Sequence, residues 1–250
     1  MDPSPRRERI FNVPGVVLAL LIVLGVIHAV RDFILSEPQD LQVLLRFAFI
    51  PARYDTTLFI TGTFPGGLGA EIWSFVSYAF LHGDWVHLGV NAAWLLAFGS
   101  PLARRFGALR LLAFFAVTAV AGAFAHLATH TGELVPMIGA SASISGAMAA
   151  AMRFVFQPGG PLRLRWGETG NDHVAAISLG QALRDPRILV FLIVWLGVNL
   201  LFGLGGGTLI GEGQSVAWQA HVGGFFAGLL LFGLFDPKSP DTPPDDRAAA

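Results

Sequence analysis

The chain of 250 residues contains no cysteine, which excludes a disulfide framework, a thiolate zinc site and a cysteine nucleophile. It is also poor in charge: only 13% of its residues are Asp, Glu, Lys or Arg, against about a quarter in a typical soluble domain. The formal net charge of −1 offers no basic surface, so we expect no nucleic-acid partner. These shortages argue against a soluble globular enzyme, a disordered protein and a nucleic-acid binder.

Apolar residues dominate instead, at 54% of the chain, and the mean hydropathy is +0.61. A bilayer core about 30 Å thick needs roughly 20 apolar residues per helix. The sequence therefore predicts an all-α, polytopic membrane protein, a bundle of six transmembrane helices. The predicted spans are 14–30, 84–100, 108–128, 137–156, 188–204 and 216–235.

The predicted membrane domain covers residues 14–235 and includes a long outer loop, 31–83. Within that loop, residues 41–54 are apolar on a partial helical face, which suits either a helix in the membrane interface or a loop packed over the spans. Residues 1–13 form the N-terminal segment, and residues 236–250, rich in Pro and Asp, read as a disordered tail.

Lys and Arg predict the orientation. Most of the 16 basic residues fall on one side of the six spans, whereas the loops 129–136 and 205–215 hold none. Because basic residues favour the cytoplasmic side, both termini are expected in the cytoplasm. A multi-pass protein of the plasma (inner) membrane is the simplest expectation.

Three groups of polar residues interrupt the apolar spans, where polar side chains are costly and often functional. The first is His87 and Asn91, four residues apart on one helix face, with His82 just before the helix. The second is Ser141, preceded by Gly139 in a run of small residues. Hydrogen bonding between helices and close helix packing are the non-catalytic explanations for these two groups.

The third group is His221, which shares one helical stripe with Gly224 and Gly228. His87, Ser141 and His221 all lie in the first two turns of spans that run in the same direction. At 1.5 Å per residue they are expected at one depth, roughly 5–10 Å below the outer surface. Three polar groups at one level predict a single site.

The chemistry expected of this site is that of an activated serine. A serine hydroxyl is a poor nucleophile until a base takes its proton, and histidine is the usual base. Ser141 and His221 are the candidate pair, and the absence of Asp and Glu from spans 137–156 and 216–235 favours a dyad over a carboxylate-oriented triad. The candidate oxyanion donors are the Asn91 amide, the His87 imidazole and the Ser141 backbone N–H.

Taken together, the motifs resemble those of the rhomboid intramembrane serine proteases, and the likeness runs from Phe75 to Gly233. The resemblance implies that Ser141 is the nucleophile, that His221 is the general base and that no metal or cofactor is needed. It implies further that His87 and Asn91 help to form the oxyanion hole and that His82 lines the site, with Gly139 among the residues that bind the oxyanion or substrate. It also implies substrates that are transmembrane segments of other proteins, cut near the outer leaflet. The matching residues are His82, His87 and Asn91, then Gly139, Ala140 and Ser141, then Ala220, His221, Gly224 and Gly228.

The chain also departs from the family pattern. Ala142 follows the candidate nucleophile where the family has Gly, and Ala103 stands where Glu is frequent. Trp73 is followed by Ser74 rather than Arg. Ser145 replaces an aromatic residue that packs on the base histidine, so His221 must be held in another way.

Three alternatives remain at this level. One is a catalytically weak or inactive relative that binds transmembrane clients without cutting them. Another is a metal site at His126 and His130, which are four apart but have no thiolate or obvious carboxylate ligand nearby. The third is a small transporter or proton channel using the buried histidines, although the sequence shows no matching halves.

Overall fold

A computed structural model of the protein describes residues 13–55, 64–162, 171–205 and 216–237. Within these ranges the regular structure is helical, apart from one antiparallel bridge between Phe49 and Met137. The expected all-α class is therefore confirmed. The predicted N-terminal segment and tail lie outside the described residues except for Val13 and residues 236–237.

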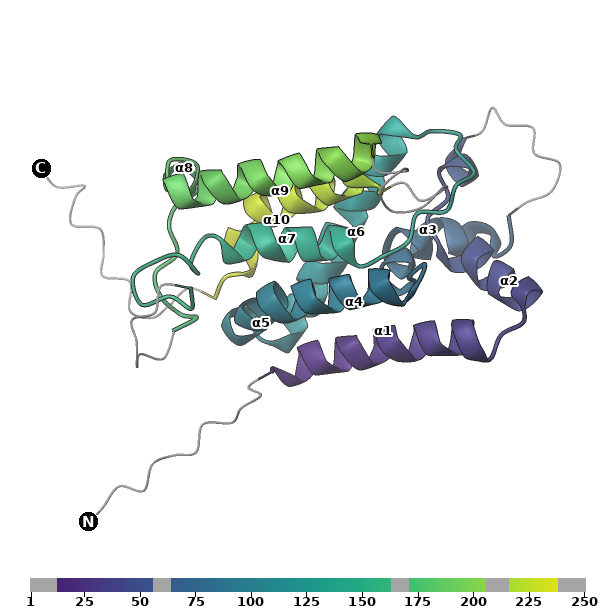
Figure 1. The fold of residues 1–250 in the computed structure, drawn as a ribbon, viewed down its shortest axis with the longest axis horizontal. Coiled ribbons are helices and arrows are strands. Elements are labelled where there is room, and N and C mark those ends of the chain that lie inside the picture. Colours follow the sequence, from purple (N-terminus) through teal and green to yellow (C-terminus); the bar gives the residue numbers. More distant parts are fainter. Residues whose placement is uncertain (1–12, 56–63, 163–170, 206–215, 238–250) are drawn as a thin grey trace, which may run out of the picture.

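Five helical stretches among the described residues are long and apolar enough to cross a membrane. Several of them run along one common direction (Figure 1). Their ends differ by a few residues from the predicted spans, and the second continues to Phe106 rather than stopping at Ser100. They are α1 (Gly15–Phe33), the stretch formed by α4 (Trp85–Trp94), η3 (Leu95–Gly99) and α5 (Ser100–Phe106), α6 (Ala108–Thr129), α9 (Pro186–Gly205) and α10 (Trp218–Phe235).

The fourth predicted span, 137–156, is too long. Its helix, α7, covers only Ser141–Ala151. Met137 is held extended by its bridge to Phe49, and Gly139 has a φ of +119°, so the helix cannot begin earlier. Every residue from Ala142 to Ala151 is buried, which shows that α7 packs among the other helices. A helix surrounded by protein needs neither the length nor the bulk of one that faces lipid.

The outer segment 31–83 contains short helices rather than a plain loop. α2 (Glu37–Phe47) starts with a capping box between Ser36 and Gln39, so the predicted helix in this region begins earlier and ends earlier than residues 41–54. The chain then turns through η1 (Pro51–Tyr54), and α3 (Gly67–Ser77) and η2 (Tyr78–Phe80) lead to α4. On the other side of the bundle, the short α8 (Leu179–Ala182) precedes α9.

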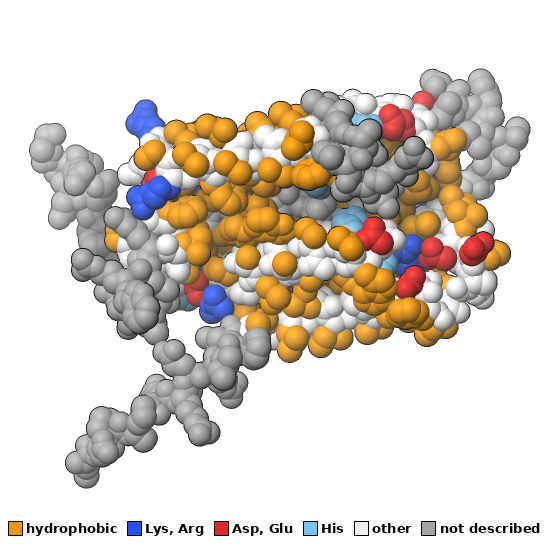
Figure 2. All heavy atoms as spheres, viewed as in Figure 1, with side chains coloured by type: hydrophobic (Ala, Val, Ile, Leu, Met, Phe, Trp, Pro, Cys, Tyr) orange, Lys and Arg blue, Asp and Glu red, His pale blue; other side chains and the backbone are white. Residues whose placement is uncertain are grey.

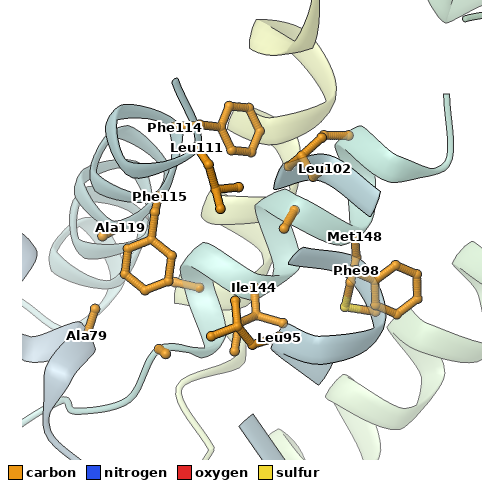
Figure 3. Close-up of a cluster of buried hydrophobic side chains, with 14 of the residues drawn as sticks. Ala79, Leu95, Phe98, Leu102, Leu111, Phe114, Phe115, Ala119, Ile144 and Met148 are labelled. Carbon is orange, nitrogen blue, oxygen red and sulfur yellow. The ribbon is translucent and has the colours of Figure 1, made fainter. Parts of the chain in front are cut away.

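The main apolar core lies around α7, where side chains from η3, α5 and α6 meet it (Figure 3). Ile144 and Met148 of α7 point into this cluster beside Leu95 and Phe98. On the outside, apolar side chains cover the middle of the visible face, and charged ones gather toward the two ends of the bundle (Figure 2). This distribution fits a multi-pass membrane protein.

Glycines bring α10 against the backbone of α7. A Cβ atom added at Gly224 would collide with the carbonyl oxygen of Ala142, and one at Gly228 would collide with that of Gly146. The His-Gly-Gly stripe predicted on this helix is thus explained by contact between two helix backbones. The contact fixes the first turn of α10, which carries His221, beside the first turn of α7.

Candidate active site

Ser141 is the first residue of α7, and the loop that precedes it is tightly held. The Gly139 N–H donates to the Tyr78 carbonyl at 3.0 Å, and the Tyr78 hydroxyl donates to the Ala119 carbonyl at 2.9 Å. Gly139 has a positive φ of +119°, and a Cβ atom there would lie 2.8 Å from the His87 Nε2. Only glycine can adopt this φ without strain and leave room for the His87 ring.

His221 lies in the first turn of α10, and its Nε2 is 2.6 Å from the Ser141 Oγ. The two residues are 80 positions apart in the sequence, so the fold itself builds this contact. Both side chains are only partly buried, whereas the rest of α7 is buried. A hydroxyl at hydrogen-bond distance from an imidazole nitrogen is the arrangement that lets histidine remove the serine proton.

His87 and Asn91 lie together on α4, as their spacing predicted. Asp84 caps this helix by accepting from the His87 backbone N–H at 2.8 Å. The Gly83 N–H donates to the His87 Nδ1 at 3.5 Å, which leaves the proton of a neutral ring on Nε2, the nitrogen that faces Gly139. The Asn91 amide donates one hydrogen to the His87 carbonyl at 3.0 Å and has a second one to offer.

The point beside Gly139 is shared by two of these groups. A Cβ atom built on Gly139 lies 2.8 Å from the His87 Nε2 and 3.6 Å from the Ser141 Oγ. The first backbone N–H groups of α7 have no acceptor within the helix and carry the positive end of its dipole. The structure therefore brings His87, Ser141 and His221, which the sequence places at one depth, to adjoining positions.

His82 lies behind His87 and has no accessible surface. Its ring is 5.0 Å from the His87 ring in an edge-to-face arrangement, and its carbonyl accepts from Arg31 at 2.8 Å. The pKa of His82 is lowered to about 3, mainly by burial, and the neighbouring His87 and His28 act in the same direction. His82 is thus a neutral, buried ring that supports His87.

Asn199 of α9 is a contact that the sequence analysis missed. Its Oδ1 is 2.5 Å from the His221 Nδ1, and its Nδ2 donates to the Trp195 carbonyl at 2.8 Å. The signal was available, because Asn199 is the sole amide or charged residue in the predicted span 188–204. An orienting group for His221 was expected only from carboxylates on spans 137–156 and 216–235, not from an amide on this span.

Two departures from the expected motif have local explanations. The Ala142 methyl packs toward α6 at Gly122, where an added Cβ atom would lie only 2.6 Å from it. The extra methyl is therefore accommodated between helices by a glycine. Ser145 donates its hydroxyl to the Ser141 carbonyl at 2.8 Å and places no ring on His221.

The alternative metal site would be built on His126 in α6 and on His130, which follows that helix. His126 and His130 stack with their ring centroids 4.2 Å apart. Among the residues that the structure describes, no group of three or more His, Cys, Asp or Glu side chains is placed to hold a metal ion.

Comparison with known proteins adds the family context. The model of the family described as "Rhomboid domain" matches residues 69–237. The chain is 29% identical to the "Rhomboid protease GlpG" of Serratia proteamaculans over 64% of this chain and 47% of that protein, and equally to that of Yersinia pseudotuberculosis. It is 26% identical to "RHOMBOID-like protein 7" of Arabidopsis thaliana over 89% of this chain and 65% of that protein. The chain thus spans about half the length of the GlpG relatives that it matches.

Proposed function

The chain belongs to the rhomboid family, and from this premise we propose that it is an intramembrane serine endopeptidase that uses a Ser141–His221 dyad. The observation that carries the proposal is the 2.6 Å distance between the Ser141 Oγ and the His221 Nε2. The named relatives that are called rhomboid proteases support the peptidase activity. The proposed substrates are transmembrane segments of other membrane proteins, reached within the bilayer.

The proposed reaction begins when His221 takes the Ser141 hydroxyl proton on Nε2 as the serine oxygen attacks the peptide carbonyl. The tetrahedral intermediate then collapses, the C–N bond breaks, and His221 returns the proton to the leaving amine. Water attacks the resulting acyl-enzyme and gives one proton to His221. Release of the new carboxyl end restores the proton to Ser141, so that every atom is accounted for without a metal or cofactor.

The oxyanion of this intermediate is assigned to donors around Gly139. We assign the His87 Nε2–H, the second hydrogen of the Asn91 amide and the first backbone N–H groups of α7. Removing one such donor typically costs about 3 kcal/mol of transition-state stabilisation. Gly139 leaves this space open, because a side chain at this position would occupy it.

The proposed membrane placement follows from charge. Arg104 and Arg105 lie in the last turn of α5, at one end of the bundle. His87 lies in the first turn of α4, at the opposite end. By the positive-inside rule the Arg-rich end is cytoplasmic, so the site lies toward the outer leaflet. We assign the protein to the plasma (inner) membrane with both termini in the cytoplasm, and the position of the cut in a substrate tests this orientation.

Labelling with a serine-reactive fluorophosphonate tests the dyad in detergent-purified protein. We expect labelling of the wild type and none of Ser141→Ala or His221→Ala. Ser143→Ala is the matched control, because Ser143 lies on the same helix but donates to the Phe115 carbonyl inside the core. Folded wild type that does not react would instead support the alternative, a weak or inactive relative that binds transmembrane clients.

A further inference from the structure

We infer that Asn199 is the positioning residue of the base: its side-chain oxygen fixes the tautomer and the ring orientation of His221. This inference rests on the proposed function, since it assigns a role around the same dyad. It goes beyond the dyad because Asn199 comes from α9, a helix that carries none of the motif residues. It is supported by the orientation of the Asn199 amide, by the register of α9 along α10, and by the lack of a carboxylate or aromatic residue on α7 and α10 that orients His221.

The orientation of the Asn199 amide is determined by its own helix. The Trp195 carbonyl can only accept a hydrogen bond, so the group 2.8 Å from it must be the NH₂ of Asn199. The oxygen of the amide therefore faces the His221 Nδ1, 2.5 Å away. An oxygen acceptor at that distance requires a hydrogen on Nδ1. In the neutral ring Nε2 then bears the lone pair, and it is this nitrogen that faces the Ser141 hydroxyl.

The register between α9 and α10 holds Asn199 in place. Residues 195, 199 and 203 lie on one stripe of α9, four apart, and they contact Phe225, His221 and Trp218 on successive turns of the antiparallel α10. The contacts above and below the amide prevent α9 from sliding along α10. On one side of the amide Trp195 stacks on Phe225, with the ring centroids 4.5 Å apart, and on the other side Trp218 packs against Gly203, where a Cβ atom would collide with the indole.

The side chains around His221 explain why an amide is needed here. Span 216–235 and span 137–156 contain no Asp or Glu that could orient the ring. Ser145, at the position where the family has an aromatic support, bonds to its own helix. Asn199 has only 8% of its surface exposed, so its oxygen is shielded from competing water. Because an amide is neutral, it orients the ring without holding a charge against it.

The first experiment compares labelling rates and pH profiles of wild type, Asn199→Leu and Asn199→Asp. We expect Asn199→Leu to react roughly 10- to 100-fold more slowly, as misplaced catalytic groups do, with an unchanged melting temperature. Asn199→Asp restores the acceptor and adds a negative charge that favours protonated His221. Its half-maximal labelling should therefore move to higher pH by about one unit or more. If Asn199 only stabilised the fold, the Asn199→Asp variant would reach half-maximal labelling at the same pH as the wild type.

The second measurement does not depend on activity. ¹⁵N spectra of histidine-labelled protein, assigned with His221→Gln, report which ring nitrogen carries the proton. We expect the Nδ1–H form in the wild type and loss of that preference in Asn199→Leu. An unchanged tautomer in Asn199→Leu, or a pH profile of Asn199→Asp that superimposes on the wild type, would overturn the inference. If the wild type is not labelled, the proposed protease function is contradicted, whereas the role of Asn199 is still tested by the spectra.

Discussion

His82 illustrates what a single buried side chain does to this protein. It lies in the segment between η2 and α4, has no accessible surface and touches the ring of His87. Burial is the main reason that its pKa falls to about 3. In the unfolded chain the same ring takes up a proton near pH 6.5. The folded state therefore binds fewer protons than the unfolded state between these two values.

Acidification should consequently destabilise the fold through His82. Stability from this residue is fully present above about pH 6.5 and is lost as the pH falls below that value. Between pH 6.5 and pH 5 the loss reaches up to about 2 kcal/mol. Thermal unfolding in detergent should thus show a smaller drop between pH 7 and pH 5 for His82→Leu than for the wild type.

The exposed His173 provides the control, because His173→Gln should keep the wild-type pH dependence. If the stability of His82→Leu and that of the wild type fall equally with pH, burial does not hinder protonation of the His82 ring. The prediction concerns stability alone, so its outcome is independent of the serine chemistry.

At the scale of elements, the short helix α7 shows which features of a helix the sequence predicts and which it does not. The small residues after Ser141 predicted close packing, and the contacts with α10 confirm it. The helix length was overestimated because hydropathy does not reveal which helix is enclosed by others. Likewise, the bridge from Phe49 to Met137 joins residues 88 positions apart in the chain, and no local pattern encodes it.

Asn199, on α9, is a second feature that the sequence predicts only in part. Its position as an isolated amide in an apolar span was visible in the sequence, but its partner was not. The pairing depends on how far α9 is shifted along α10, and that shift is set by Trp195 and Trp218. The contact between Ser141 and His221 could be predicted because both residues lie in local motifs. The contacts that support this pair depend on helix register and could not be predicted.

The close contact between α7 and α10 can be tested directly. In Gly224→Ala the new methyl collides with the Ala142 carbonyl, so α10 must move away from α7. We expect a loss of about 1–3 kcal/mol in stability, as is usual for overpacking. Labelling of Ser141 should slow roughly 10- to 100-fold, because His221 moves with the helix.

Gly233→Ala on the same helix is the control, because an added Cβ atom there meets nothing within 4 Å. That variant should label at the wild-type rate. A wild-type labelling rate and melting temperature in Gly224→Ala would contradict the close packing of α10 against α7.

At the scale of the whole molecule, the bundle separates structural and chemical tasks. Among the 18-residue windows of the five candidate spans, those in α1 and α9 are the least buried, at 22% and 11%, and so leave the most surface for lipid. α7 is enclosed by the other helices, and its N-terminus carries Ser141. The all-helical membrane fold followed from composition and hydropathy, since both describe the chain as a whole. The exact seating of the helices followed only from their side-chain contacts.

The central claim is tested by cleavage of a single-span substrate with small residues near its outer end, reconstituted with the protein in liposomes. We expect cleavage by wild type and by Ser143→Ala, and a loss of more than about 1,000-fold in Ser141→Ala. Product masses should place the cut in the half of the substrate away from its cytoplasmic end. Cleavage that persists in Ser141→Ala would contradict the serine mechanism, and a cut near the cytoplasmic end would contradict the orientation.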